Sequence, residues 1–274
     1  MKLPILLRAA FCSLGLSLLV GASCAESHER GNRWTDWTTL QLKAKSAPLM
    51  RGKVELRLKD DGDGRRLETT TSARFFGVSI ARSDTTTLFD TVTGRIEKYS
   101  SYSPKKGRRY LFNEHGYSVE KLKPARADDG DGSWEVTSRK EFDYPVNEGR
   151  STPVFDYYGM LIQLRRQPLR APGDEVTLHV ATSNGPEAYR IIVSESRTAE
   201  RTFVDLGTQE QITLPVREFR LTVSPADPQA EEGFLKMEGE VEIWVEAETK
   251  TLLEIVGKVP KVPGKVKLVL SAMG

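Results

Sequence analysis

Two acidic segments carry the residues of this sequence that are most able to bind a metal ion. Asp60–Gly64 and Asp128–Gly132 both read DDGDG, and carboxylates clustered around glycine are typical of calcium-binding loops. The EF-hand pattern fails in both segments, because Arg66 stands where the first loop needs glycine and Lys140 where the second needs glutamate. We therefore interpret both segments as hairpin turns, for which Asp-Gly is the strongest short-range signal.

The other chemistry-bearing residues form no recognisable catalytic or metal set. The three histidines, His28, His115 and His179, lack the spacing of a zinc site. The sequence contains no G-x-S-x-G, no P-loop and no G-x-G-x-x-G. We expect no catalytic residue, no metal and no cofactor, and we favour a protein that is not an enzyme. A hydrolase of envelope polymers stays a less favoured alternative, because its paired carboxylates are not locatable in a sequence.

Two basic clusters are the remaining candidates for binding. They comprise Lys105, Lys106, Arg108 and Arg109 in the first cluster and Arg165, Arg166 and Arg170 in the second. Either cluster would suit the anionic head groups of envelope lipids. We favour a solvated loop for the first and a solvated helix end for the second, where arginine complements the helix dipole.

Period-two alternation of apolar and polar residues predicts the elements that must position these groups. Val54, Leu56 and Leu58 alternate with charged residues, which is typical of a half-buried antiparallel strand. Short runs of this kind, separated by turn residues, continue to Leu270. The pattern predicts an all-β fold, an antiparallel meander that forms an open barrel or paired curved sheets.

One segment breaks the strand pattern and predicts a single inserted amphipathic helix at about residues 153–166. Thr152 would be the N-cap, with proline at the first helical position, and Pro168 would stop the helix. Apolar residues then fall at helical spacing on one face, namely Val154, Phe155, Tyr158, Leu161 and Ile162.

The N-terminus has the layout of a secretory signal peptide over residues 1–25. Lys2 and Arg8 precede an uncharged apolar stretch, and small residues follow up to Ala25. The stretch is shorter than the roughly 20 apolar residues of a spanning helix. We predict cleavage before Glu26 and a periplasmic location. The alternative is lipidation of Cys24, which would anchor the protein to a membrane and give its only membrane contact.

Processing changes the charge and the cysteine content of the body that folds. Both cysteines, Cys12 and Cys24, lie in the processed segment, so we expect no disulfide in the mature domain. Loss of two of the 40 basic residues leaves as many basic as the 38 acidic ones, which argues against a nucleic-acid partner. We expect a polar linker over residues 26–48 and one β-rich domain over 49–274. Trp34, Trp37 and Leu40 in the linker share a helical spacing, which favours docking on the core over a membrane interface.

The C-terminal half resembles the exported bacterial family known as domain of unknown function 3108. Thr152–Leu169 resembles that family's signature, in which an aspartate opens a short helix that ends in an aliphatic-Arg pair before a Pro-Leu stretch. Val241–Glu248 resembles the strand of its last hairpin. The resemblance extends over most of residues 50–270. It implies a periplasmic β-protein with a curved sheet and an inserted helix, and it carries over no functional residue.

These observations lead to a hypothesis of a non-enzymatic binding protein of the cell envelope. Its curved sheet would hold an apolar ligand, such as a lipid acyl chain, with the helix as plug or lid. The residues expected to contact that ligand are Phe155, Tyr158, Leu161 and Ile162. The alternative is a structural or assembly factor that docks on another envelope protein, with its sheet interior filled by its own side chains. A hollow or a packed interior would distinguish the two.

Overall fold

The computed structural model describes residues 34–44, 50–62, 64–75, 78–90, 93–124, 134–227, 229, 233–260, 262 and 264–274. The predicted signal peptide and Cys24 lie outside these residues. The chain divides into two compact units, Met1–Trp37 and Thr38–Gly274. Of the first unit the structure describes residues 34–37, in which Trp34 and Trp37 are buried. Among the described residues, no helix combines the length and the apolar character needed to cross a membrane.

The second unit is built almost entirely of strands, as the alternation predicts. The strands are β1 (Thr39–Ala44), β2 (Met50–Asp61), β3 (Gly64–Phe75), β4 (Val78–Asp90), β5 (Ile96–Ser103), β6 (Lys106–Phe112), β7 (Gly116–Pro124), β8 (Trp134–Asp143), β9 (Val146–Asn147), β10 (Arg150–Ser151), β11 (Val154–Phe155), β12 (Glu175–Thr182), β13 (Gly185–Asp205), β14 (Gln211–Pro225), β15 (Glu238–Glu246), β16 (Leu252–Lys258) and β17 (Lys265–Met273). The helical elements are α2 (Tyr157–Gln163) and the short 3-10 turns η1 (Leu164–Arg166) and η2 (Phe234–Lys236).

A 15-stranded sheet contains every strand except the β9–β10 hairpin, and neighbours in the chain are neighbours in the sheet. Its order runs β11-β12-β13-β14-β15-β16-β17-β1-β2-β3-β4-β5-β6-β7-β8. The first and last strands therefore meet, since β1 pairs with β17. This arrangement confirms the predicted antiparallel meander.

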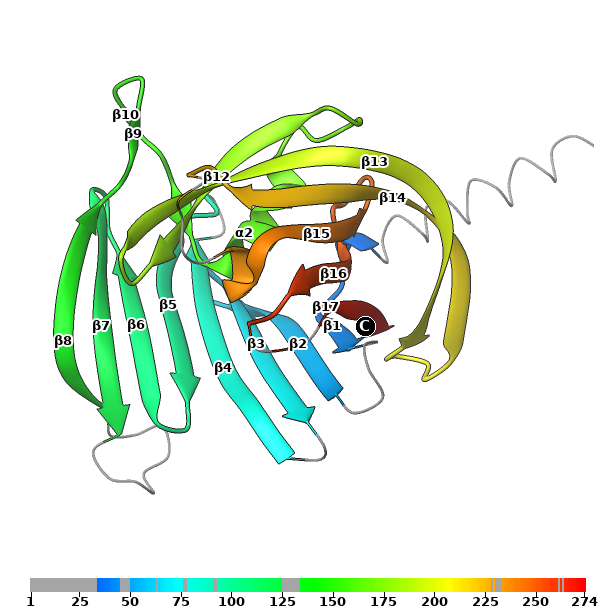
Figure 1. The fold of residues 1–274 in the computed structure, drawn as a ribbon, viewed down its shortest axis with the longest axis horizontal. Helices are drawn as coiled ribbons and strands as arrows, with labels where there is room; N and C mark the ends of the chain where they lie inside the picture. Colours follow the sequence, from blue (N-terminus) through cyan, green and yellow to red (C-terminus); the bar gives the residue numbers. More distant parts are fainter. Residues whose placement is uncertain are drawn as a thin grey trace, which may run out of the picture. The chain divides into compact units, whose positions relative to one another are not determined.

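The sheet curls on itself at one end only. The long hairpin of β13 and β14 bends around, and the end of β13 pairs with the end of β17, Val204 opposite Ala272. This pairing closes a ring from β13 to β17, whereas β11 and β8 remain the two ends of the sheet order. Figure 1 shows the curved hairpin wrapping around β15 and β16. The sheet is therefore open as a whole and contains one closed ring, formed by β13 to β17. This agrees with the open barrel or curved sheets expected from the sequence.

The first DDGDG segment is a hairpin turn, as predicted. Asp61 lies opposite Gly64 at the end of the β2–β3 ladder, and Gly62 has a φ of 60°, which glycine adopts without steric cost. The second segment lies outside the described residues. The strands that it connects, β7 and β8, are antiparallel neighbours with Pro124 opposite Trp134.

The predicted helix is confirmed, but its predicted start at Thr152 and Pro153 is wrong. Val154 and Phe155 form β11, which pairs in parallel with β12. Asp156 is the N-cap, and its carboxylate accepts hydrogen bonds from the backbone N–H groups of Tyr158 at 2.9 Å and Gly159 at 3.1 Å. An aspartate that satisfies two orphan donors outcompetes the upstream threonine.

The predicted polar linker over residues 26–48 is also wrong in part, because Thr39–Ala44 form β1 between β17 and β2. Leu40 and Leu42 of this strand are almost fully buried, at 1% and 0% exposure. The helical spacing predicted to continue to Leu40 is therefore not realised, since that residue lies in a strand. Only two alternating leucines mark this strand in the sequence, which is too short a pattern to distinguish from a linker.

Buried ion pairs join the strands of the ring. Arg201 on β13 donates from Nε to the Glu218 carboxylate on β14 at 2.7 Å and from Nη1 to Glu254 on β16 at 3.0 Å. Glu218 also accepts from Arg197 at 2.6 Å, and its side chain is fully buried. Loss of one member of such a network leaves an uncompensated buried charge, which is strongly destabilising.

We predict that Glu218→Gln lowers the free energy of unfolding by about 3 kcal/mol, because it leaves two arginines without their buried partner. The matched control is Glu195→Gln, which breaks the half-exposed pair with Arg220 and costs less than about 1 kcal/mol. Urea unfolding measures both values. Equal losses in the two variants would show that the ring does not depend on the buried network.

Candidate functional site

A polar cavity of about 290 Å³ lies where the start of α2 meets β5, β6 and the β12–β13 hairpin. This volume is near the lower end of the range for small-molecule pockets, about 300 to 1,000 Å³. Its described lining consists of Tyr99, Ser101, Arg108, Tyr110, Asp156, Tyr157, Ala181, Thr182, Ser183, Asn184, Glu187 and Lys236. Most of these side chains end in a hydroxyl, amide or charged group, so the cavity suits a polar ligand.

Strand register places the first wall of the cavity. Tyr99 lies opposite Tyr110, and Ser101 lies opposite Arg108, in the β5–β6 ladder. Directly opposed residues project to the same face of a sheet, so these four side chains line one surface. The opposite wall comes from the tight turn between β12 and β13, where Thr182 Oγ1 donates to the carbonyl of Gly185 at 2.8 Å.

Of the described residues of the cavity, Arg108 is the cation that is free to bind a ligand. Within the described part of the chain its guanidinium makes no ion pair and no side-chain hydrogen bond. Its neighbour Arg109 projects to the other face and pairs with Glu120 at 2.6 Å. Alternate residues of a strand face opposite sides of the sheet. The two arginines of the first predicted basic cluster are therefore separated, with Arg109 paired on one face and Arg108 in the cavity on the other.

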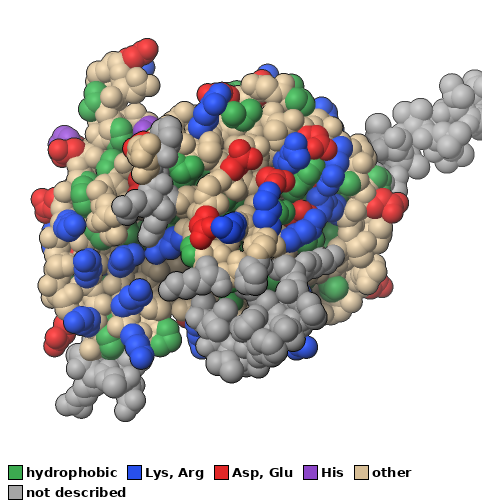
Figure 2. All heavy atoms as spheres, viewed as in Figure 1, with side chains coloured by type: hydrophobic (Ala, Val, Ile, Leu, Met, Phe, Trp, Pro, Cys, Tyr) green, Lys and Arg blue, Asp and Glu red, His purple; other side chains and the backbone are tan. Residues whose placement is uncertain are grey.

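The face that carries Arg108 continues as a cationic surface on β6, β7 and β8. Lys121 lies opposite Arg108, and Lys140 lies opposite Val119 on the same face. Lys106 at the start of β6 shares this face and is exposed. Figure 2 shows Lys and Arg side chains gathered over these strands, with few acidic side chains among them. The positive electrostatic potential of this surface attracts anionic ligands toward the cavity.

Asp156 is the buried acid of the cavity. Its carboxylate caps α2 and also accepts a hydrogen bond from Thr87 Oγ1 on β4 at 2.9 Å. Burial raises the pKa of Asp156 to about 6, against the opposing effect of its hydrogen bonds to Gly159, Thr87 and Tyr158. Because these bonds occupy both carboxylate oxygens, we assign Asp156 a positioning role for α2.

The aromatic residues beside the cavity are largely packed against one another. Tyr99 and Tyr110 lie with ring centroids 5.1 Å apart, and Tyr117 lies 5.4 Å from Phe142. Burial raises the pKa of the Tyr99 hydroxyl well above its usual value. This cluster, which also contains Val119, Val154 and Ala181, fills the sheet interior next to the cavity with side chains.

The four residues predicted to contact a ligand do not belong to the described lining of this cavity. Phe155 and Leu161 are buried, at 5% exposure each, and Ile162 is half-buried. The hydroxyl of Tyr158 hydrogen-bonds Thr71 Oγ1 on β3 at 3.1 Å. Their immediate neighbours, Asp156 and Tyr157, line the cavity instead.

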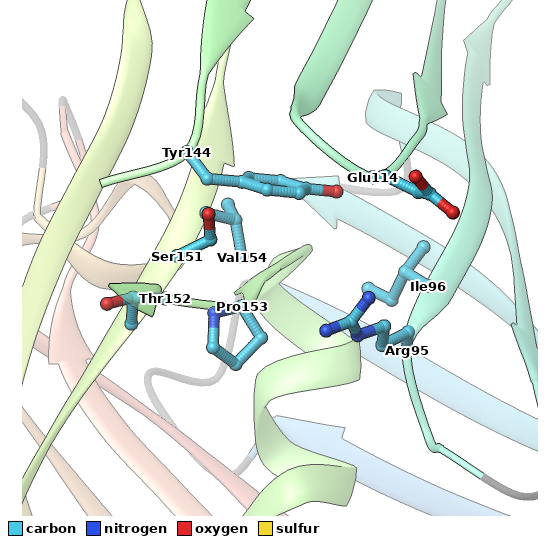
Figure 3. Close-up of a pocket in the computed structure, with 8 residues that line it drawn as sticks. All are labelled: Arg95, Ile96, Glu114, Tyr144, Ser151, Thr152, Pro153 and Val154. Atoms are coloured by element: carbon cyan, nitrogen blue, oxygen red, sulfur yellow. The ribbon is translucent and has the colours of Figure 1, made fainter. Parts of the chain in front are cut away.

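A second, much smaller pocket of about 20 Å³ lies just before α2 (Figure 3). Tyr144 covers Ser151 and Val154 on one side of it, with Arg95 and Glu114 on the other. The predicted helix start, Thr152 and Pro153, forms part of its wall. A volume of this size holds about one water, so we exclude it as a ligand site.

The comparisons with known proteins identify a family and give no activity. The sequence profile of a family described as "Protein of unknown function (DUF3108)" matches residues 45–271. No curated protein matches the chain at a significant level. A comparison with solved structures finds the "Beta-barrel-like Protein of Domain of Unknown Function DUF1849" from Brucella abortus, with a TM-score of 0.44 and 9% identity over 86% of this chain and 95% of that chain. The family match confirms the resemblance carried by Thr152–Leu169 and Val241–Glu248.

We predict that Asp156→Asn abolishes a pH dependence of stability that the wild-type carboxyl creates. The folded pKa of about 6 lies above the usual 3.8, so the folded state binds the proton more tightly and loses stability as pH rises from about 4 to 6. The asparagine still accepts the N–H bonds at the helix start. Relative to wild type, the variant should gain about 3 kcal/mol between pH 4 and pH 7, measured by urea unfolding.

The matched control is Asp174→Asn. Backbone N–H groups of Arg170 and Ala171 lower the pKa of Asp174, so that carboxylate contributes stability above its usual pKa and loses it as pH falls. The control should therefore be less stable than wild type by nearly the same amount at pH 4 and at pH 7, because the wild-type carboxylate loses this stability mainly below about pH 4. An unchanged difference between Asp156→Asn and wild type at the two pH values would contradict the assignment.

Proposed function

Since the chain belongs to the DUF3108 family, whose description names no activity, we propose a function from the geometry of the cavity. The protein is a binding protein of the cell envelope that holds a small polar ligand with an anionic group. The observation that carries this proposal is the Arg108 guanidinium, which has no ion pair within the described residues and lies in a cavity lined by hydroxyl, amide and charged groups.

The polarity of the lining favours this ligand over the acyl chain expected from the sequence. Ser101, Thr182 and Asn184 offer hydrogen-bonding groups, and the rings of Tyr99 and Tyr110 offer flat surfaces. An acyl chain would leave the polar groups of the wall without partners, which costs free energy. A phosphorylated or carboxylated sugar matches both the polar groups and the positive charge.

The acidic residues of the lining set the orientation of the ligand. Glu187 accepts a hydrogen bond from the Tyr189 hydroxyl at 3.0 Å, which holds the carboxylate in place. The hydroxyl groups of a ligand would donate to this side of the cavity, while its anionic group would meet Arg108. Like charges would repel the anionic group from Glu187, so one orientation is favoured.

The envelope location in this proposal is supported by residues 1–25, which have the layout of a secretory signal. The alternative of lipidation at Cys24 would place the same cavity at a membrane surface. The other hypothesis from the sequence, an assembly factor that docks on an envelope protein, stays a prediction.

We predict that Arg108→Gln weakens binding of a polar anion at least about tenfold, the effect of losing a charged hydrogen bond. Thermal shift measurements with glucose 6-phosphate, citrate and palmitate would identify the chemical class of ligand that binds. We expect at least one polar anion, and not palmitate, to raise the melting temperature, and calorimetry then gives the affinities of the variants.

The matched control is Lys121→Gln, which removes one positive charge directly opposite Arg108 from an exposed position outside the described lining. This control should change the affinity by less than about threefold, as expected for an exposed charge. Stabilisation by palmitate alone, or equal losses in both variants, would contradict the proposed function.

A further inference from the structure

A basic groove of about 470 Å³ lies at the other end of the α2–η1 segment. Three separate parts of the chain build it, and their described lining is Arg165, Arg166, Gln167, Pro168, Leu169, Arg170, Arg217, Phe219, Ala247, Glu248 and Lys250. Five of these residues are cationic and one is acidic. Such an excess of one sign in a concave site attracts anions.

Buried leucines anchor the segment that carries three of the arginines of the groove. Leu164 and Leu169 are fully buried, at 0% exposure each, and they anchor the segment that carries Arg165, Arg166 and Arg170. Arg166 donates from Nη1 to the carbonyl of Thr93 at 3.0 Å. The groove is therefore set on packed residues and does not depend on a free loop.

Lys250 is buried, which distinguishes this groove from an ordinary solvated surface. This residue lies in the β15–β16 turn with a φ of 57°, and it is 6% exposed. Its Nζ donates to the carbonyls of Ala247 and Glu248. A lysine ammonium is rarely buried without a carboxylate partner, and within the described residues this ammonium forms no direct ion pair.

An aromatic ring organises two of the cations around the groove. The Nζ of Lys250 lies 5.2 Å from the centroid of Phe219, and the guanidinium carbon of Arg217 lies 5.6 Å from it. Within the described residues the Arg217 side chain has no ion pair and no hydrogen bond. Both cations therefore lie within cation–π range of the same ring.

Two acids, Glu246 and Glu248, lie near the cations of the groove. Glu246 accepts hydrogen bonds from the backbone of Glu248 and Thr249 and from the Thr249 hydroxyl at 2.7 Å. Burial lowers the pKa of Lys250, and the charges of Arg217 and Arg170 lower it further, against the raising effects of Glu246 and Glu248. The charges of Glu246 and Glu248 therefore offset those of Arg217 and Arg170 at Lys250, and burial is the main cause of its lowered pKa.

We propose that this groove binds phosphate groups, with Arg217, Arg170 and Lys250 as the ligand-contacting cations. Guanidinium groups match the oxygens of phosphate with paired hydrogen bonds, and an ammonium adds a point charge. The phosphate would belong either to a free phosphorylated molecule or to a lipid head group. The site does not depend on the proposed function, because the cavity and the groove share none of their described lining residues.

The test uses the full chain, calorimetry with pyrophosphate, and co-sedimentation with vesicles of phosphatidylcholine containing phosphatidylglycerol. We expect saturable binding of pyrophosphate and a loss of at least about tenfold in affinity for Arg217→Gln, as for a charged hydrogen bond. The matched control is Arg82→Gln, at a side chain that is 66% exposed on β4, and it should leave the affinity unchanged.

Vesicle binding that Arg217→Gln also abolishes would identify a lipid head group as the source, and binding of pyrophosphate alone would identify a free phosphorylated molecule. Both results support the site. Absence of pyrophosphate binding, or equal losses in Arg217→Gln and Arg82→Gln, would overturn the proposal. Because Arg217 is exposed, circular dichroism of the variant is expected to match wild type, which separates lost binding from lost folding.

Discussion

The position of α2 depends on the buried carboxylate of Asp156, and both candidate sites depend on the position of α2. One carboxylate oxygen takes the N–H groups that begin the helix, and the other takes the Thr87 hydroxyl of β4. The same helix reaches β3 through the Tyr158 hydroxyl and reaches the carbonyl of Gly94 through Gln163. A seven-residue helix has little stability of its own, so these tertiary bonds and its buried apolar residues hold it in the concave sheet.

The two ends of the α2–η1 segment contribute residues to two sites of different chemistry. The start of α2 places Asp156 and Tyr157 in the cavity with Arg108, and η1 places Arg165 and Arg166 in the basic groove. The sheet supplies the opposite wall in each case, because its strands curve around the helix (Figure 1).

The sequence predicts the strands well because alternation is local, and it predicts the sites poorly because they are assembled from distant segments. The alternation of Val54, Leu56 and Leu58 determines β2 without reference to any other strand. The division of Arg108 from Arg109 between two faces follows from the same local rule, once the strand is recognised. The bond that ties the Asp156 carboxylate to β4 instead needs Thr87, which lies 69 residues away, and the contact between Lys250 and the ring of Phe219 joins the β15–β16 turn to β14.

The central claim is that the cavity beside Asp156 holds a small polar anion, and native mass spectrometry of the protein isolated from the cells that produce it tests this claim most directly. The account predicts a complex with one small polar molecule, of a size that fits about 290 Å³, and loss of that complex in Arg108→Gln. A protein that carries an acyl lipid, or that retains its small ligand in Arg108→Gln, would contradict the claim.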